Sequence, residues 1–164
     1  MSINMTLKHR HPIRKKIADG IIKQVEEEMG CNVVHGNIVE SAEFNGIKLL
    51  LIDGSPDIIF LNDSPFLTLH GIKKYKPMRR FATVDRGAVK FVLSGANVMA
   101  PGITEADENI RKGDAVWVRN EEGTAMALGY ALMGGKEMVE KKKGVAIESI
   151  HHIGDELWEL ATNL

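Results

Sequence analysis

The segment from Val84 to Ile103 constrains the fold of this chain more than any other stretch of the sequence. Asp85 is a favourable N-cap residue for a helix, and Gly95 can end that helix in a left-handed conformation. The chain then turns at once into a short apolar strand at Val98–Met99. The spacing therefore predicts a tight corner in which a helix, a glycine and a strand follow one another.

The second half of the chain contains several short strand signals separated by glycines, which is typical of a small closed or nearly closed β-barrel. The expected strands are Phe81–Val84, Val98–Met99, Ala115–Arg119, Ala125–Met133, Val145–His152 and Glu156–Glu159. The expected short helices are Asp85–Leu93 and Lys136–Lys142. The fold class predicted for this half is a small β-barrel with short helices.

The order of helix and strand signals in the first half of the chain predicts a compact α+β unit with a curled antiparallel sheet. A helix is expected from Pro12 to Met29, because proline suits a first helical turn and Gly30 suits the position just past the end. Its expected apolar stripe comprises Ile13, Ile17, Ile21 and Val25, widened by Ile22 and Met29. The Asn45–Gly46 pair inside Glu43–Ile52 is a strong hairpin signal. Further expected elements are strands at Val33–Val34, Ile38–Val39 and Ile58–Leu61, and a helix from Ser64 to Ile72 capped by Ser64.

A domain boundary is predicted within the segment Lys73–Arg80. Five of its eight residues are cationic, and Pro77 breaks any helix. We therefore expect an N-terminal α+β domain at residues 1–77 and the barrel domain at residues 78–164.

Composition limits the possible partners and compartments. The net charge of -1 over 164 residues argues against a protein that coats nucleic acid non-specifically, although it permits a local basic patch. No run approaches the roughly 20 apolar residues of a membrane helix, and the polar N-terminus argues against a secretory signal. Cys31 is the only cysteine, so an intramolecular disulfide is impossible and a cytoplasmic location is expected.

The predicted corner is the best candidate for a binding site. Backbone donors exposed there, beside Arg86 and Lys90, could hold a phosphate or a terminal base. Gly102 would let the backbone approach a partner closely. The residues predicted to bind RNA are Arg79, Arg80, Arg86, Gly87, Lys90, Gly95, Ala96, Asn97, Met99, Ala100, Pro101 and Gly102. The alternative is that the glycines only build a tight barrel.

Other residues that could carry chemistry have simpler interpretations. A zinc site is weakly supported, because the candidate ligands have neither a paired cysteine spacing nor a His-Glu-x-x-His pattern. These candidate ligands are His9, His11, His35 and His70. Cys31 is expected to be a small buried hydrophobe, and Lys141–Lys143 to suit a helix dipole. With no Walker loop, nucleophile elbow or metal set, the chain is expected to be no enzyme and to need no cofactor.

The aromatic residues divide into core residues and one candidate for base stacking. Trp117 and Trp158 lie in patterns that predict buried strands. Tyr75 lies among lysines, which makes it the better stacking candidate.

The Val84–Ile103 segment resembles the PUA domain, a module shared by pseudouridine synthases and archaeosine transglycosylases. The resemblance rests on three linked submotifs: the opening Asp85–Ala88, the turn Leu93–Ala96 and the close Met99–Ile103. It implies an RNA-binding barrel.

The resemblance extends over nearly the whole chain to the malignant T-cell-amplified sequence family, which has a pre-PUA domain before its PUA domain. The matching stretches are Val89–Asn97, Lys143–His151, Gly154–Trp158 and Ser64–His70, followed by Lys74, Tyr75 and Pro77. That family binds the small ribosomal subunit, pairs with the density-regulated protein, and assists translation initiation and recycling. The resemblance thus implies a non-catalytic protein that associates with ribosomal RNA or tRNA.

Two further points stay open at this stage. A partner equivalent to the density-regulated protein, if the protein uses one, is expected to act in trans, and the N-terminal domain is expected either to dock such a partner or to brace against the ribosome. The alternative function is an accessory protein of tRNA or rRNA modification, in the pseudouridine or archaeosine pathways, although roughly 75 N-terminal residues leave little room for a catalytic domain.

Overall fold

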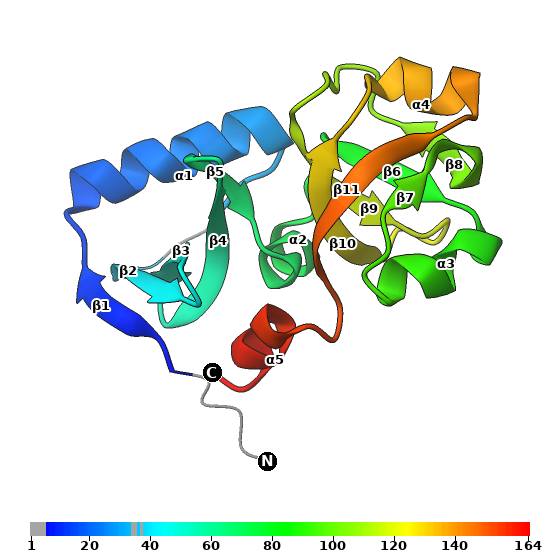
Figure 1. The fold of residues 1–164 in the computed structure, drawn as a ribbon. Helices are drawn as coiled ribbons and strands as arrows, with labels where there is room; N and C mark the ends of the chain where they lie inside the picture. Colours follow the sequence, from blue (N-terminus) through cyan, green and yellow to red (C-terminus); the bar gives the residue numbers. More distant parts are fainter. Residues whose placement is uncertain (1–5, 34–35, 37) are drawn as a thin grey trace, which may run out of the picture. The chain divides into compact units, whose positions relative to one another are not determined.

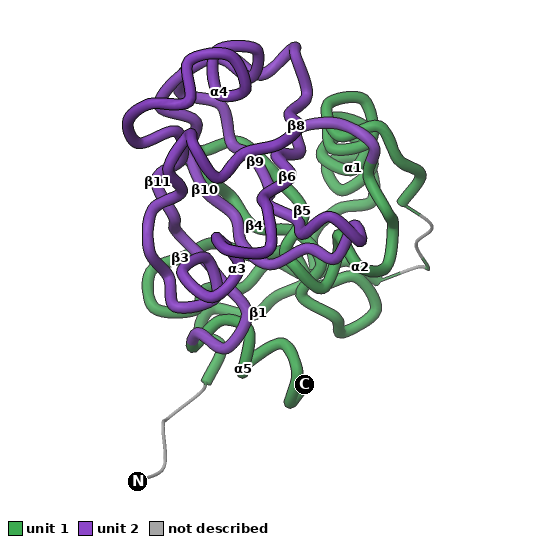
Figure 2. Tube along the Cα trace, turned by 90° about the vertical axis from the view of Figure 1, so that its right-hand side faces the viewer, with its two compact units in different colours: residues 1–77, 156–164 green, residues 78–155 purple. Residues whose placement is uncertain are grey.

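The computed structural model describes residues 6–33, 36 and 38–164. The chain divides into two compact units, which Figure 2 colours separately. Unit 1 comprises Met1–Pro77 together with Glu156–Leu164, and unit 2 comprises Met78–Asp155. The nine C-terminal residues thus group with the first unit, while the domain division at residues 77 and 78 stays a prediction.

Unit 1 contains a five-stranded antiparallel sheet whose spatial order follows the chain. Its strands are β1 (Lys8–Pro12), β2 (Val39–Phe44), β3 (Ile47–Ile52), β4 (Ser55–Leu61) and β5 (Ser64–Leu67). Three two-residue turns join β2 to β5, and both residues of each turn have positive φ. These turns are Asn45–Gly46, Asp53–Gly54 and Asn62–Asp63. Such turns match the twist of paired strands, so the predicted Asn45–Gly46 hairpin is confirmed.

The main helix of unit 1, α1 (Lys15–Met29), lies along the sheet beside β5 (Figure 1). It ends at Gly30, whose φ of 67° is left-handed, as expected. It begins later than predicted, because Pro12 is the last residue of β1. Its buried stripe is Ala18, Ile22, Val25 and Met29. The prediction that Ile17 faces inward is wrong, since that side chain is 54% exposed. Residues spaced strictly by four drift around a helix that turns every 3.6 residues.

The predicted helix that begins at Ser64 is also wrong at its start. Ser64 and Pro65 belong to β5, an edge strand, where a missing backbone N–H costs no ladder bond. The helix α2 (Leu69–Tyr75) begins after Thr68, whose side chain accepts a hydrogen bond from the Gly71 N–H at 3.0 Å.

The last element, α5 (Glu156–Thr162), is a helix where a strand was predicted. Leu157 and Leu160 are buried three residues apart, which is a helical spacing. Trp158 is therefore not in a strand; its ring stacks on His70 of α2 at 4.2 Å between ring centroids. Val34, His35 and Asn37 lie outside the described residues, so the strand predicted there is not described.

Unit 2 is a six-stranded, nearly closed barrel, which confirms the predicted α+β class with a small β-barrel and short helices. The strands are β6 (Phe81–Val84), β7 (Val98–Met99), β8 (Ile103–Ala106), β9 (Ala115–Arg119), β10 (Ala125–Ala131) and β11 (Val145–His152). Their order is β7-β11-β10-β9-β6-β8, with β6 and β9 parallel and the other pairs antiparallel. The helices are α3 (Arg86–Leu93), α4 (Gly135–Lys141) and the 3-10 turn η1 (Ala100–Gly102).

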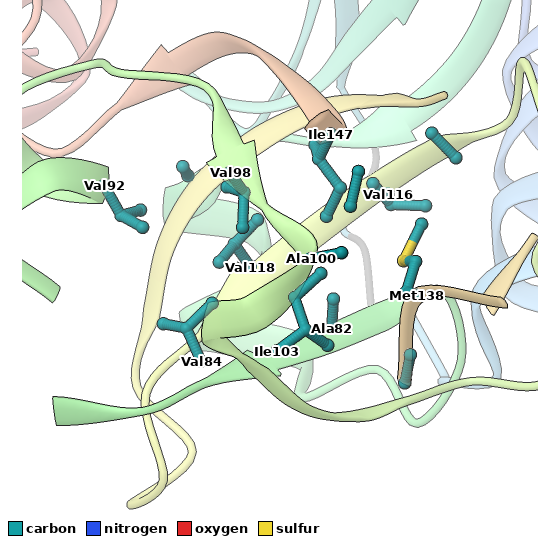
Figure 3. Packing of buried hydrophobic residues seen from close by; sticks show 14 of the residues in the cluster. Ala82, Val84, Val92, Val98, Ala100, Ile103, Val116, Val118, Met138 and Ile147 are labelled. Atoms are coloured by element: carbon teal, nitrogen blue, oxygen red, sulfur yellow. The ribbon is translucent and has the colours of Figure 1, made fainter. Parts of the chain in front are cut away.

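The interior of the barrel is filled by small and branched side chains from all of its walls. Figure 3 shows Val84, Val98, Ala100, Ile103, Val116 and Ile147 converging there, with Met138 of α4 closing one side. Gly129 is required by close strand packing, because a Cβ there would lie 2.3 Å from the carbonyl oxygen of Glu148. Trp117 is 3% exposed, which confirms its expected place in the core. No helix within the described ranges is long and apolar enough to cross a membrane.

Candidate nucleic-acid interface

The predicted corner is present in the structure. Asp85 caps α3, and its carboxylate accepts a hydrogen bond from the Ala88 N–H at 2.9 Å. Gly95 follows the helix with φ of 88°, a conformation that favours glycine. A Cβ at Gly95 would lie 2.8 Å from Nε2 of His152, so the position is restricted by space as well as by backbone conformation.

The corner is held together by backbone contacts between α3 and the strands. The Asp85 N–H donates to the carbonyl oxygen of Gly102 at 2.8 Å, and a Cβ at Gly102 would meet that of Ala88 at 3.0 Å. The side-chain oxygen of Asn97 accepts a hydrogen bond from the Ser149 N–H of β11 at 3.0 Å. These contacts hold α3 against the barrel as a ridge, called the α3 ridge below.

The ridge separates two hollows. The apolar hollow, of about 650 Å³, lies on one side of α3 and is lined by Phe91, Met99, Pro101 and Val145 among others. The charged hollow, of about 590 Å³, lies on the other side. It contains Arg86, Lys90, Glu121 and Glu122.

Two large apolar side chains at the apolar hollow are exposed to solvent. Phe91 is 56% exposed and Met99 is 49% exposed, while their neighbours Val92 and Val98 are buried and anchor the same elements. Exposed apolar groups gathered in a hollow mark a binding surface more often than apolar groups scattered singly. Aromatic faces can stack on nucleotide bases.

Most of the predicted RNA-binding residues line the two hollows. These are Arg86, Gly87, Lys90, Ala96, Asn97, Met99, Pro101 and Gly102. Gly95 lies beside His152 at the end of the ridge. Ala100 is fully buried in the core, so its side chain is not exposed to a ligand. Its backbone N–H donates a hydrogen bond to the carbonyl oxygen of Gly144.

Arg79 and Arg80 precede β6, at the end opposite α3. The Arg79 carbonyl oxygen accepts a hydrogen bond from Nε1 of Trp117 at 2.7 Å. The Arg80 guanidinium lies 3.6 Å from the carboxylate of Asp114. The backbone N–H of Arg80 donates a hydrogen bond to the carboxylate of Asp107 at 2.7 Å. The structure therefore does not bring these two arginines onto the α3 ridge.

Phe91, Glu121 and Glu122 were missed by the sequence analysis. An apolar residue on the exposed face of the α3 helix was the available signal for Phe91. Nothing in the sequence places the two glutamates opposite α3, since their positions depend on how β9 and β10 pair.

Unit 1 holds a different polar cluster, centred on the fully buried carboxylate of Asp57. It accepts hydrogen bonds from Ser55 at 2.7 Å, from Lys74 at 2.9 and 3.0 Å, and from the Tyr75 hydroxyl at 2.6 Å. Burial raises the pKa of Tyr75, and the hydrogen bond to Asp57 and the charge of that carboxylate raise it further. Because its hydroxyl is bound inside unit 1, Tyr75 is a structural residue in this arrangement.

The remaining candidates form no site among the residues described. No group of three His, Cys, Asp or Glu side chains there could hold a metal ion, and His35 lies outside those residues. Cys31 is half-buried; burial raises the pKa of its thiol, and the nearby Glu26 carboxylate adds to the effect.

Comparison with known proteins gives a consistent result. The model of the PUA domain matches residues 81–153. An uncharacterised protein of Methanocaldococcus jannaschii is 37% identical over 158 residues, covering 94% of this chain and 98% of that protein. Translation machinery-associated protein 20 of Schizosaccharomyces pombe is 34% identical over 175 residues, covering 93% of this chain and 92% of the relative.

The fold is also matched by a solved structure. A conserved PUA domain protein from Thermoplasma acidophilum superposes with a TM-score of 0.79 at 33% identity, covering 92% of this chain and 97% of that one. The malignant T-cell-amplified sequence 1 homolog of Drosophila melanogaster is 36% identical over 118 residues, covering 67% of this chain and 64% of the homolog. These matches confirm the resemblance that the sequence motifs indicated.

Proposed function

Because the chain belongs to the family of PUA-domain proteins that includes translation machinery-associated protein 20, we propose that it is a non-catalytic RNA-binding protein of translation. The RNA would lie across the α3 ridge. The observation that carries this proposal is the ridge itself, with exposed Phe91 and Met99 on one side and exposed Arg86 and Lys90 on the other.

Each side of the ridge suits one part of a nucleotide. A base can stack on the ring of Phe91 in the apolar hollow, since stacking on an aromatic side chain contributes roughly 1–3 kcal/mol per base. Arg86 and Lys90 can neutralise the phosphates that follow. Gly87 and Gly102 let the RNA backbone approach without a side chain in the way. Arg79 and Arg80 would then act mainly by holding the start of β6.

The finer role that we propose draws on the names of the relatives. We place the protein in the cytoplasm, on the small ribosomal subunit or on tRNA, in initiation or recycling. Unit 1 would dock a protein partner that resembles the density-regulated protein, since relatives named as translation machinery-associated proteins support such a setting. The RNA-modification accessory role is the competing proposal, and it requires tRNA binding without subunit binding.

The experiment is a salt titration of binding to purified small ribosomal subunits and to tRNA. The test variant is Arg86→Ala/Lys90→Ala, and the matched control is Lys112→Ala/Lys136→Ala, which removes two exposed cations elsewhere in unit 2. We expect the test variant to lower the salt slope by about one per lost phosphate contact, with little change in the control. An unchanged affinity and slope in the test variant would reject the ridge as the binding site.

A further inference from the structure

The side chain of Asn97 lines the apolar hollow in an orientation that the barrel fixes. Its amide oxygen accepts a hydrogen bond from the backbone N–H of Ser149 in β11 at 3.0 Å. A backbone N–H can bond only to the oxygen of an amide, so the positions of the oxygen and the nitrogen are both defined. The amide nitrogen, with its two N–H donors, is the atom that remains for a ligand in the hollow.

Asn97 lies beside the exposed ring of Phe91. The backbone N–H of Ala96 donates to the carbonyl oxygen of Phe91 at 3.1 Å, so the chain folds back on the end of α3 just before it reaches Asn97. Both residues line the same hollow, together with the half-exposed side chain of Met99. Proteins hold an unstacked RNA base in this way, with an aromatic face for the ring and hydrogen bonds for its edge.

The bond between Asn97 and Ser149 also has a structural purpose, because it ties the connection between α3 and β7 to β11. That purpose requires only an oxygen acceptor, which an aspartate would supply equally well. The asparagine adds two donors to the hollow and brings no negative charge that would repel the phosphates of an RNA. The structural purpose therefore accounts for one half of the amide, and a ligand accounts for the other.

We propose that Asn97 is a specificity-determining residue, whose amide nitrogen donates to an acceptor atom on the edge of the base that stacks on Phe91. This inference rests on the proposed RNA-binding function. Because its oxygen is bound to Ser149, Asn97 cannot form the two-point pair that a free asparagine makes with adenine. It can only donate, so the hollow reads the ring nitrogens or carbonyl oxygens of the base.

The test compares the unmodified chain with Asn97→Asp. Aspartate has nearly the same shape and can still accept from the Ser149 N–H, so the variant replaces the two donors by an acceptor and keeps the fold. The probes are short homopolymeric RNAs of uridine, cytidine or adenosine, of which only the last two carry an amino group on the base. The added charge should weaken binding to all three alike, because their phosphates are the same. The affinity for cytidine and adenosine RNA relative to uridine RNA should rise about fivefold, since a carboxylate accepts from amino groups.

The matched control is Asn109→Asp, which makes the same change of shape and charge at an exposed position of unit 2 that lines neither hollow. It should leave the relative affinities unchanged. A further probe needs no variant: a ribose-phosphate chain of the same length without bases should bind the unmodified protein about tenfold more weakly than the RNAs.

The outcomes separate the inference from the proposed function. A rise in relative affinity in Asn97→Asp alone supports both. Unchanged relative affinities, or equal binding of the base-free chain, would overturn the role of Asn97, and the function would stand as long as Arg86→Ala/Lys90→Ala still weakens binding. If the unmodified protein binds neither the RNAs nor the base-free chain in a salt-dependent way, the function and the inference both fail.

Discussion

The buried cluster around Asp57 in unit 1 and the α3 ridge in unit 2 place their chemical groups in opposite ways. In the first, a charged carboxylate is fully buried and bound by Ser55, Lys74 and Tyr75. In the second, an aromatic ring, Phe91, is more than half exposed. Each arrangement is unfavourable unless something compensates for it.

The difference indicates which region is structural and which binds. Every described buried side-chain polar atom has a hydrogen-bond partner, so the Asp57 cluster is compensated inside the protein. Within the ridge the Phe91 ring meets the Lys90 ammonium at 5.1 Å from the ring centroid, yet Phe91 and Met99 keep about half of their surface exposed, which is what a ligand could cover. Substitutions in the two regions should therefore separate stability from affinity.

The largest effect is expected for Asp57→Ala. Removing the carboxylate leaves the Tyr75 hydroxyl and the Ser55 hydroxyl without their acceptor, while the half-exposed Lys74 can turn to water. We expect the free energy of unfolding of the protein to fall by about 3 kcal/mol, measured by urea denaturation.

If the Asp57 cluster is purely structural, the Asp57→Ala protein should keep its affinity for RNA when it is folded. Binding measured at low temperature, where the variant is folded, should match the unmodified protein within about twofold, well below one tenfold step of 1.4 kcal/mol. A large loss of affinity in the folded variant would show that the Asp57 cluster is not purely structural.

The next effect is expected for Phe91→Ala, with the opposite outcome. Loss of one stacking surface should weaken RNA binding by about tenfold, and the free energy of unfolding should stay within about 0.5 kcal/mol. The matched control is Met78→Ala, which removes a 77% exposed side chain at the far end of β6. Equal losses of affinity in both variants would argue against a stacking role.

The sequence predicted those parts of both regions that depend on local signals. The α3 corner was predictable because its signals are local: Asp85 caps the helix that begins at the next residue, and Gly95 turns the chain just after the helix ends. The β5 strand was mistaken for a helix start because the local signal at Ser64–Pro65 competes with pairing to β4. The strand predicted at Glu156–Glu159 was wrong because the packing of α5 on α2 decides that segment.

The residues of the candidate site also divide into those that local sequence signals predict and those that they do not. Its glycines and cations could be predicted, because they lie in one continuous stretch of the chain. The two glutamates of the charged hollow, Glu121 and Glu122, could not be predicted, since they reach the ridge only through the pairing of β9 with β10 and β6. The Asp57 cluster was equally hidden, because Lys74 and Tyr75 lie 17 and 18 residues away from Asp57.

A smaller effect is expected for Tyr75→Phe, and its pH dependence tests the cluster directly. Loss of the hydrogen bond to Asp57 should lower the free energy of unfolding by about 1 kcal/mol at neutral pH. Burial raises the pKa of Tyr75 in the folded state, so its neutral form is favoured there. The stability that this shift contributes is present below the unfolded pKa of about 10 and is lost as pH rises through the folded pKa.

Urea denaturation of both proteins across alkaline pH checks this. The advantage of the unmodified protein over Tyr75→Phe should be constant below about pH 9 and shrink above about pH 10. All other titratable groups are common to both proteins, so the difference between them isolates the tyrosine. A difference that grows with pH would contradict the direction of the shift.

The smallest effect is expected for Arg10→Ala, which separates burial from ion pairing within unit 1. Arg10 of β1 donates two hydrogen bonds of 2.9 Å to Glu40 of β2, a geometry at least as good as that between Lys74 and Asp57. These bonds lower the pKa of Glu40, so their contribution is present above its unfolded pKa of about 4.3 and lost as pH falls. All of β1 is exposed, however, and the Glu40 side chain keeps 18% of its surface exposed where that of Asp57 keeps none, so water and salt screen this pair. We therefore expect a loss of at most about 0.5 kcal/mol in urea denaturation, vanishing at high salt. A loss as large as that of Asp57→Ala would mean that pairing geometry, and not burial, makes the Asp57 cluster structural.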